Sequence, residues 1–106
     1  MPDGFSVREG SLFCEAVSAD SLAQRFATPL YVYSQTAITD AFAEWTEAFG
    51  EAEHLICFAV KANSNIAILK LLASLGSGFD IVSGGELRRV LAAGGDAGKV
   101  VFSGVG

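Results

Sequence analysis

Leu-Ile-Cys-Phe-Ala-Val-Lys-Ala-Asn-Ser-Asn-Ile, residues 55–66, is the stretch that decides the fold. An apolar run carries Lys61 at its end, and a helical pattern begins after it. Side chains of a strand alternate between two faces. One face would therefore present Leu55, Cys57, Ala59 and Lys61, and the other Ile56, Phe58 and Val60. The first face is lined by small side chains next to the amine, and the second is expected to pack against helices.

Lys61 is the first candidate for chemistry. The carboxyl end of a buried strand is where open α/β sheets and barrels bind their ligands. A partly desolvated amine is more readily neutral, and a neutral amine attacks carbonyl compounds to form a Schiff base. The alternative is a strand-end lysine whose head lies in water. Position alone favours this second interpretation.

Length and composition bound the remaining possibilities. A chain of 106 residues is at most one small domain, and 51% apolar residues indicate a globular chain. The 7 basic and 12 acidic residues give a net charge of −5, which argues against nucleic acid or a membrane surface as partner. No apolar run approaches the roughly 18 residues of a membrane span, and the first residues do not resemble a signal peptide. We therefore expect a cytoplasmic protein.

Cysteine and histidine offer little further chemistry. Cys14 and Cys57 are too few for a disulfide framework or a metal site, so both are expected to be reduced and small apolar side chains. His54, the only histidine, precedes the Lys61 strand and lies at the wrong end of it for a ligand site. The sequence predicts no metal.

The first half of the chain predicts a hairpin or two extended segments over 5–17. Asp20 or Ser21 is expected to cap a short helix, and an extended stretch follows over 29–34. A longer helix over 35–49 would begin at Ser34 and end at Gly50. Its stripe of large side chains is expected to pack in the core; the stripe consists of Ile38, Phe42, Trp45 and Phe49.

The second half alternates strands and helices. After Lys61, Asn63 or Ser64 is expected to cap an apolar helix that ends near Gly76. A strand over 79–82, a helix ending at Gly94-Gly95, and a strand over 99–103 follow. Strand, helix and strand with short connections predict right-handed units with parallel strands. The four candidate strands, with 29–34 included, cannot close an eight-stranded barrel, which takes about 250 residues.

Three ordered motifs carry a family resemblance. Phe58-Ala59-Val60-Lys61-Ala62-Asn63, followed by Ile68-Leu69, Leu72 and Gly76, resembles the pyridoxal-phosphate attachment segment of the ornithine/diaminopimelate/arginine decarboxylase family. This family belongs to the alanine-racemase-like class of pyridoxal enzymes. The segments 78–87 and 28–33 are most similar to its diaminopimelate-specific branch. The chain thus resembles the N-terminal part of such an enzyme.

The resemblance implies a fold and an activity. The fold would be α/β, a partial (β/α)8 TIM-type barrel, with 28–106 as its first part. Residues 1–27 would form an extended segment and a short helix, and the extended segment would join a β domain of the full enzyme. The implied cofactor is pyridoxal 5'-phosphate, and the implied reaction is decarboxylation of meso-diaminopimelate, a small-molecule substrate, to L-lysine. The full enzyme would be a homodimer, and the 106 residues alone would be inactive.

The resemblance also assigns site residues. Lys61 would be the catalytic residue that attaches the cofactor, with Ala59 and Asp80 as further cofactor-binding residues. Asp80 alternates with Phe79 and Ile81, so it would point inward near Lys61, where a carboxylate favours a protonated amine. A hydrogen-bonded strand-end carboxylate is the alternative. In the family, the partner of the pyridine nitrogen and the phosphate loop lie further along the chain.

Several alternatives stay open. Ser83-Gly84-Gly85-Glu86 fits a helix capping box better than a phosphate-binding helix start. Asn63 and Ser64 are either caps or residues of the pocket mouth. The substrate could instead be that of an ornithine, arginine or carboxynorspermidine decarboxylase. A non-catalytic pyridoxal-phosphate-binding or structural α/β fragment is a further reading. Alanine racemase fits less well, because its attachment motif continues differently after Asn63.

Overall fold

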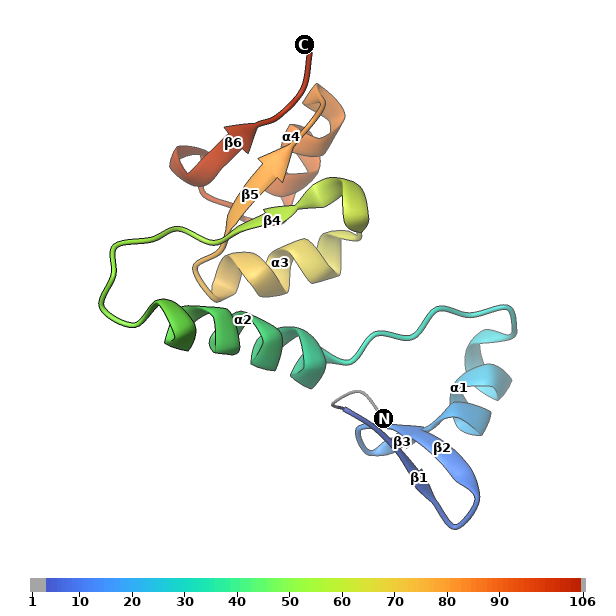
Figure 1. The fold of residues 1–106 in the computed structure, drawn as a ribbon. Coiled ribbons are helices and arrows are strands. Elements are labelled where there is room, and N and C mark those ends of the chain that lie inside the picture. Colours follow the sequence, from blue (N-terminus) through green and yellow to red (C-terminus); the bar gives the residue numbers. More distant parts are fainter. Residues whose placement is uncertain (1–3, 106) are drawn as a thin grey trace. The chain divides into compact units, whose positions relative to one another are not determined.

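A computed structural model describes residues 4–105 (Figure 1). The chain divides into two compact units between Ala41 and Phe42. The boundary lies within the longest helix, α2 (Gln35–Phe49). The division between 1–27 and 28–106 that the sequence suggested stays a prediction.

The first unit is built on a small antiparallel sheet in the order β1-β2-β3. Its strands are β1 (Phe5–Arg8), β2 (Ser11–Cys14) and β3 (Val17–Ser18), and helix α1 (Ala19–Phe26) follows directly. The tight turn between β1 and β2 has positive φ angles at Glu9 and Gly10, as hairpin turns require. The predicted hairpin is confirmed.

The start of α1 differs from the prediction. Ser18 caps the helix, and its Oγ accepts a 3.1 Å hydrogen bond from the amide of Ser21. The prediction of Asp20 or Ser21 as the cap was wrong. The reason is that Ser18 ends β3 with an extended backbone, which already presents its hydroxyl to the first turn.

The ends of α2 are as predicted. Ser34 is 2% exposed, and its Oγ accepts a hydrogen bond from the amide of Ala37. Gly50 ends the helix with a φ of 57°, a left-handed conformation that glycine adopts without strain. The stretch 29–34 before the helix is not a strand, so that prediction was wrong. Its residues form no ladder with another strand among 4–105.

The large side chains of α2 do not form a core. Trp45 is 61% exposed and Phe49 is 43% exposed, and no residue of α2 is buried. The core interpretation of this stripe was therefore wrong. The rings stack on each other instead: the centroids of Trp45 and Phe49 are 6.3 Å apart, and those of Phe49 and His54 are 4.8 Å apart.

The second unit contains a parallel sheet in the order β4-β5-β6. The strands are β4 (Cys57–Ala59), β5 (Gly78–Ile81) and β6 (Val100–Phe102). Helices α3 (Ile66–Ser74) and α4 (Gly84–Ala92) connect them, together with the 3-10 turns η1 (Val60–Ala62) and η2 (Ala97–Lys99). The predicted alternation of strands and helices is confirmed. The sheet has three strands, fewer than the four predicted.

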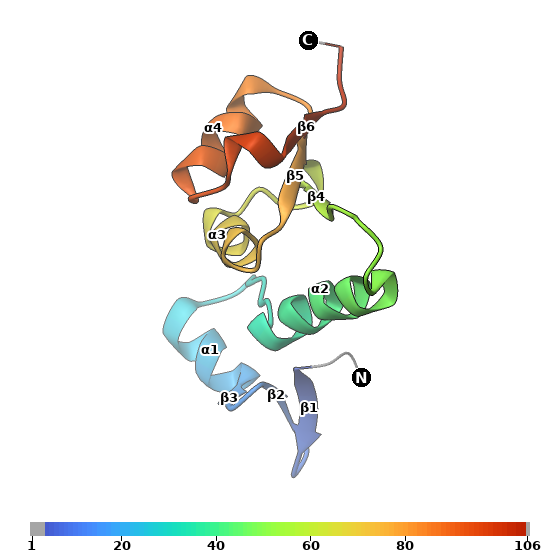
Figure 2. The same ribbon diagram turned by 90° about the vertical axis from the view of Figure 1, so that its left-hand side faces the viewer.

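The core of this unit lies between the sheet and its two helices, which Figure 2 shows on one side of the strands. Its fully buried side chains are Phe79, Leu69, Val60 and Val90. Gly95 packs closely against this core, because a Cβ on it would lie 2.4 Å from Val90 and 3.2 Å from the ring of Phe79. Phe79 therefore faces α4, and the opposite face of β5 is turned away from the helices.

Helix α3 begins later than predicted. Asn65 is its cap, with Oδ1 accepting a 2.9 Å hydrogen bond from the amide of Ala67. Asn63 binds the capping residue itself: its Oδ1 accepts a hydrogen bond from the amide of Asn65 and so orients that residue. The prediction of Asn63 or Ser64 as the cap was wrong because the chain makes an additional 3-10 turn before the helix.

Candidate functional site

Lys61 lies in the 3-10 turn η1 and its side chain is exposed. Strand β4 ends at Ala59, and the amide of Asn63 closes the turn by donating to the carbonyl of Val60 at 3.0 Å. Val60 is fully buried beneath this turn. Lys61 is therefore at the carboxyl end of its strand, as predicted. The assumption that strand alternation extends to Lys61 was wrong, because the turn begins directly after Ala59.

Ala59 and Asp80 are neighbours across the sheet. Ala59 is the register partner of Asp80, and Asp80 is the partner of Val101 on its other side. Alternation along β5 places these three residues on the face opposite to Phe79, away from the helices. Lys61 follows Ala59 by two residues at the same edge. The register thus brings Ala59 and Asp80 side by side, and Lys61 follows in the turn after β4.

Asp80 is the least satisfied polar group of this face. Its Oδ1 is shielded from solvent and has no hydrogen-bond partner among residues 4–105. The free-energy cost of burying a carboxylate oxygen without a hydrogen-bond donor is larger than that of burying a neutral polar atom in the same way. This oxygen is therefore available to a donor on a ligand or on a neighbouring side chain.

Small residues line the strands below Asp80. A Cβ on Gly78 would lie 2.6 Å from the carbonyl oxygen of Lys99 and 2.8 Å from Sγ of Cys57, so only glycine allows this approach of the strands. Burial and the nearby charge of Asp80 raise the pKa of the Cys57 thiol. Cys57 is thus a protonated, unreactive thiol at neutral pH, in agreement with its predicted structural role.

Side chains at the start of α4 bind backbone amides at and before its first turn. Oγ of Ser83 accepts from the amide of Glu86 at 3.2 Å, and Oε1 of Glu86 accepts from the amide of Val82 at 2.9 Å. The capping interpretation is confirmed for Ser83, whereas Glu86 binds the amide of Val82, one residue before the cap, and not the amide of Ser83. Arg89 on the same helix donates a 3.1 Å hydrogen bond to the carbonyl of Ser64, which ties α4 to the segment after Lys61.

Sequence reasoning did not select Ser103, the residue that follows β6. Its amide donates a 2.9 Å hydrogen bond to the carbonyl of Ile81, so the pairing of β5 and β6 continues to this position. Its side chain is exposed. The available signal was its place two residues after Val101, at the end of a predicted strand.

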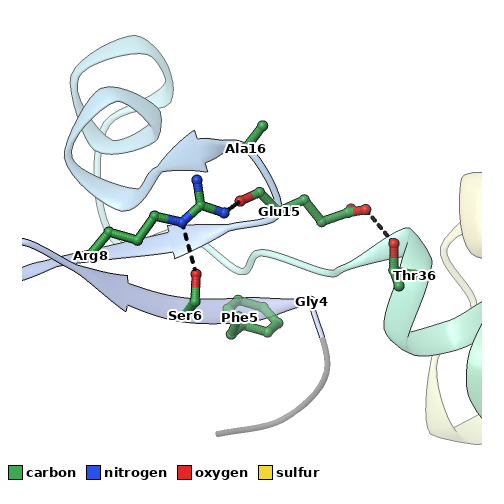
Figure 3. Close-up of a pocket in the computed structure, with 7 residues that line it drawn as sticks. All are labelled: Gly4, Phe5, Ser6, Arg8, Glu15, Ala16 and Thr36. Atoms are coloured by element: carbon green, nitrogen blue, oxygen red, sulfur yellow. Dashed lines mark hydrogen bonds between the residues drawn. The ribbon is translucent and has the colours of Figure 1, made fainter.

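The first unit has a separate hollow of about 380 Å3 (Figure 3). The guanidinium of Arg8 donates to Oγ of Ser6 at 3.3 Å and to the carbonyl of Glu15 at 2.9 Å. The Thr36 hydroxyl in turn donates to the Glu15 carboxylate. Because these polar groups bind one another, the hollow is a hydrogen-bonded junction of the hairpin with the start of α2.

The described part of the chain shows neither a metal-binding cluster nor a membrane-spanning helix. Residues 4–105 contain no cluster of three or more histidine, cysteine, aspartate or glutamate side chains that could hold a metal ion. Nor does any helix within that range have the length and apolar character needed to cross a membrane.

Comparison with known proteins identifies relatives of this chain. The diaminopimelate decarboxylase of Neisseria meningitidis serogroup A is 66% identical over 96 residues, which is 91% of this chain and 24% of that protein. The crystal structure of diaminopimelate decarboxylase from M. jannaschii matches with a TM-score of 0.93 at 38% identity, over 97% of this chain and 25% of that one. The Helicobacter pylori enzyme complexed with L-lysine matches with a TM-score of 0.78 at 50% identity, over 82% of this chain and 22% of that one.

The chain spans about a quarter of the length of these relatives. Residues 35–106 match the family model described as pyridoxal-dependent decarboxylase, pyridoxal binding domain. This match includes β4, β5 and β6 and the whole edge that carries Lys61, Asp80 and Ser103. The chain therefore belongs to the pyridoxal-dependent decarboxylase family.

Proposed function

We propose that this chain is the N-terminal quarter of a diaminopimelate decarboxylase and contributes the lysine that binds pyridoxal 5'-phosphate. The observation that carries the proposal is the edge formed by Lys61, Ala59 and Asp80, which lies inside the segment matched by the family model. In the complete enzyme, the parallel sheet would be the first part of a (β/α)8 barrel. The complete enzyme would be a cytoplasmic homodimer.

The residues present fit the cofactor. Lys61 offers an exposed amine at the carboxyl edge of the sheet, where such sheets bind ligands. Ala59 is small and leaves space beside that amine. The shielded Oδ1 of Asp80 lacks a donor, which is what a site built for a cationic group would show.

The roles of the chain's own residues follow from their chemistry. Lys61 would hold the cofactor by its amine. The Asp80 carboxylate would favour the protonated form of the Lys61 nitrogen. When bound, pyridoxal phosphate supplies an electron sink for the electrons left by the departing carboxyl group. The small side chain of Ala59 would leave the space beside the Lys61 amine open to the ring of the cofactor.

The substrate of the proposal is meso-diaminopimelate, and the product is L-lysine. Its support is the name of the relatives, of which one binds L-lysine in its crystal structure. The residues that would recognise the distal end of the substrate are not assigned to this chain.

The test is reductive trapping in the complete polypeptide that carries this chain. Borohydride reduction in the presence of pyridoxal phosphate, followed by peptide mapping, should place the pyridoxyl group on Lys61. Lys61→Ala should abolish both the label and the release of carbon dioxide from meso-diaminopimelate. Lys70→Ala is the matched control, because Lys70 lies exposed on α3, and it should leave both largely unchanged. A label on Lys70 or Lys99 would contradict the proposal.

A further inference from the structure

Ser103 lies at the same edge of the sheet as Lys61. Its amide continues the ladder between β5 and β6 by donating to the carbonyl of Ile81. Strand β6 ends at Phe102, but this hydrogen bond extends the pairing by one residue, so continued alternation puts Ser103 on the face of Val101, the register partner of Asp80. Ser103 is therefore a diagonal neighbour of Asp80, displaced toward the ligand-binding edge.

Asp80 needs a donor that its direct neighbours do not supply. Its register partners are Ala59 and Val101, whose side chains have no polar hydrogen. Gly78, two residues earlier on the same strand, has no side chain. Diagonal neighbours lie about 7–8 Å apart between Cα atoms, a distance that an aspartate and a serine side chain span only when they lean toward each other. Besides Ser103, the side chains at diagonal positions that carry a polar hydrogen are Cys57 and Lys99. The Cys57 thiol is a weak donor, and Nζ of Lys99 donates to the carbonyl of Gly76 at 3.4 Å, which leaves the Ser103 hydroxyl.

The chain after Ser103 is held near the end of β5. A Cβ on Gly104 would lie 3.2 Å from the carbonyl oxygen of Val82 and 3.0 Å from the ring of Phe102. A Cβ at this point would require the Phe102 ring or the Val82 carbonyl to shift by a few tenths of an ångström. The backbone of Ser103 is thus held by the Ile81 carbonyl and followed by a closely packed glycine, while its hydroxyl stays exposed.

We propose that Ser103 is a positioning residue of the decarboxylase site. Its hydroxyl donates a hydrogen bond to Oδ1 of Asp80 in the loaded enzyme and holds that carboxylate toward Lys61. A neutral hydroxyl suits the position of Ser103, because it can donate to the carboxylate without adding a charge that would compete with the Lys61 nitrogen. The inference rests on the proposed function, since it assumes that Lys61 is engaged by the cofactor.

The experiment is a double-mutant cycle in the complete polypeptide, with the dissociation constant for pyridoxal phosphate as its readout. Ser103→Ala should raise this constant by about three- to tenfold, the effect of one hydrogen bond to a charged group. Ser103→Thr keeps the hydroxyl and should restore binding. Ser74→Ala is the control, because the Ser74 hydroxyl is exposed and donates to the carbonyl of Leu71 on α3.

The cycle is completed in an Asp80→Asn background. If Ser103 acts through the Asp80 carboxylate, Ser103→Ala should change the constant by less than about 1.5-fold there, because coupled residues are not additive. The same factor in both backgrounds, or no effect in the first, would overturn the inference. Borohydride labelling of Lys61 in each variant separates the two proposals. A labelled Lys61 with an additive cycle removes only the role of Ser103, whereas an unlabelled Lys61 removes the proposed function.

Discussion

At the scale of single residues, Cys57 reports on the charge of Asp80. Burial, and secondly the Asp80 carboxylate, raise the pKa of this thiol above its ordinary value of 9.0. Iodoacetamide reacts with the thiolate, so Cys57 should be alkylated slowly at neutral pH. Asp80→Asn removes the second cause and should increase the alkylation rate by about two- to threefold at fixed pH. Peptide mapping distinguishes Cys57 from Cys14, whose own rate should not change.

The same shift fixes the sign of a pH dependence. The folded pKa of Cys57 lies above that of the unfolded chain, so the protonated thiol contributes stability that is fully present below pH 9.0. This contribution is lost as the pH rises through the raised pKa. Cys57→Ala should therefore flatten the alkaline fall of the unfolding free energy, measured by urea titration between pH 8 and about 10. An unchanged slope would show that other groups dominate this range.

At the scale of elements, Gly78 sets the spacing of the parallel strands. An alanine Cβ at this position would lie 2.6 Å from the carbonyl oxygen of Lys99, which is a backbone atom and cannot move aside easily. We expect Gly78→Ala to lower the unfolding free energy of the complete polypeptide by about 1–3 kcal/mol. Gly85→Ala is the matched control, because the nearest atom to its Cβ is Oγ of Ser83 at 3.8 Å. Equal losses in the two variants would contradict the packing argument.

Ser83 tests the distinction between a cap and a catalyst. Its Oγ accepts from the amide of Glu86, so Ser83→Ala should destabilise the protein by about 1 kcal/mol. Ser83→Asp keeps an acceptor and should recover most of that loss. Urea titration gives the stability, and carbon dioxide release gives the turnover. A large loss of turnover at unchanged stability would mean that Ser83 has a chemical role.

The elements also show how far sequence reasoning reaches. Periodicity located α2, α3, α4 and the parallel strands, because each repeats an apolar pattern over several residues. It misplaced the caps at Ser18 and Asn65, since a cap depends on where the preceding backbone turns, and several polar residues competed for each position. Ser103 was not selected for another reason: its proposed role arises from the pairing with β5, which a single strand pattern does not contain.

The same reasoning explains the partial prediction of the site. Lys61, Ala59 and Asp80 were selected from motifs and alternation, and the register of β4 and β5 brings Ala59 and Asp80 side by side. The 3-10 turn at Lys61 was not predicted, because its sequence is apolar enough to continue a strand. Tertiary burial of Val60 accompanies the turn and has no local signal.

At the scale of the whole molecule, the second unit leaves sheet edges unpaired among the described residues and apolar side chains exposed. The parallel sheet has outer strands β4 and β6, and neither outer edge pairs with another strand within residues 4–105. Unpaired parallel edges bind other strands readily. Apolar side chains are also exposed on this unit, including Trp45, Ile66 and Phe102. The predicted apolar surface of α3 is only partly open, since Ile68, Leu69 and Leu72 are buried.

We therefore expect residues 1–106, purified as a separate molecule, to self-associate and to release no carbon dioxide from meso-diaminopimelate with added pyridoxal phosphate. Attachment of the cofactor needs an amine and an aldehyde, whereas we expect turnover to need further groups, because the chain spans about a quarter of the length of its relatives. Light scattering after gel filtration gives the mass, and a carbon dioxide assay gives the activity. The complete polypeptide, assayed in parallel, is the positive control. A stable monomer of 11.0 kDa that turns over substrate would contradict both expectations, because the three-stranded sheet would then suffice for folding and for catalysis.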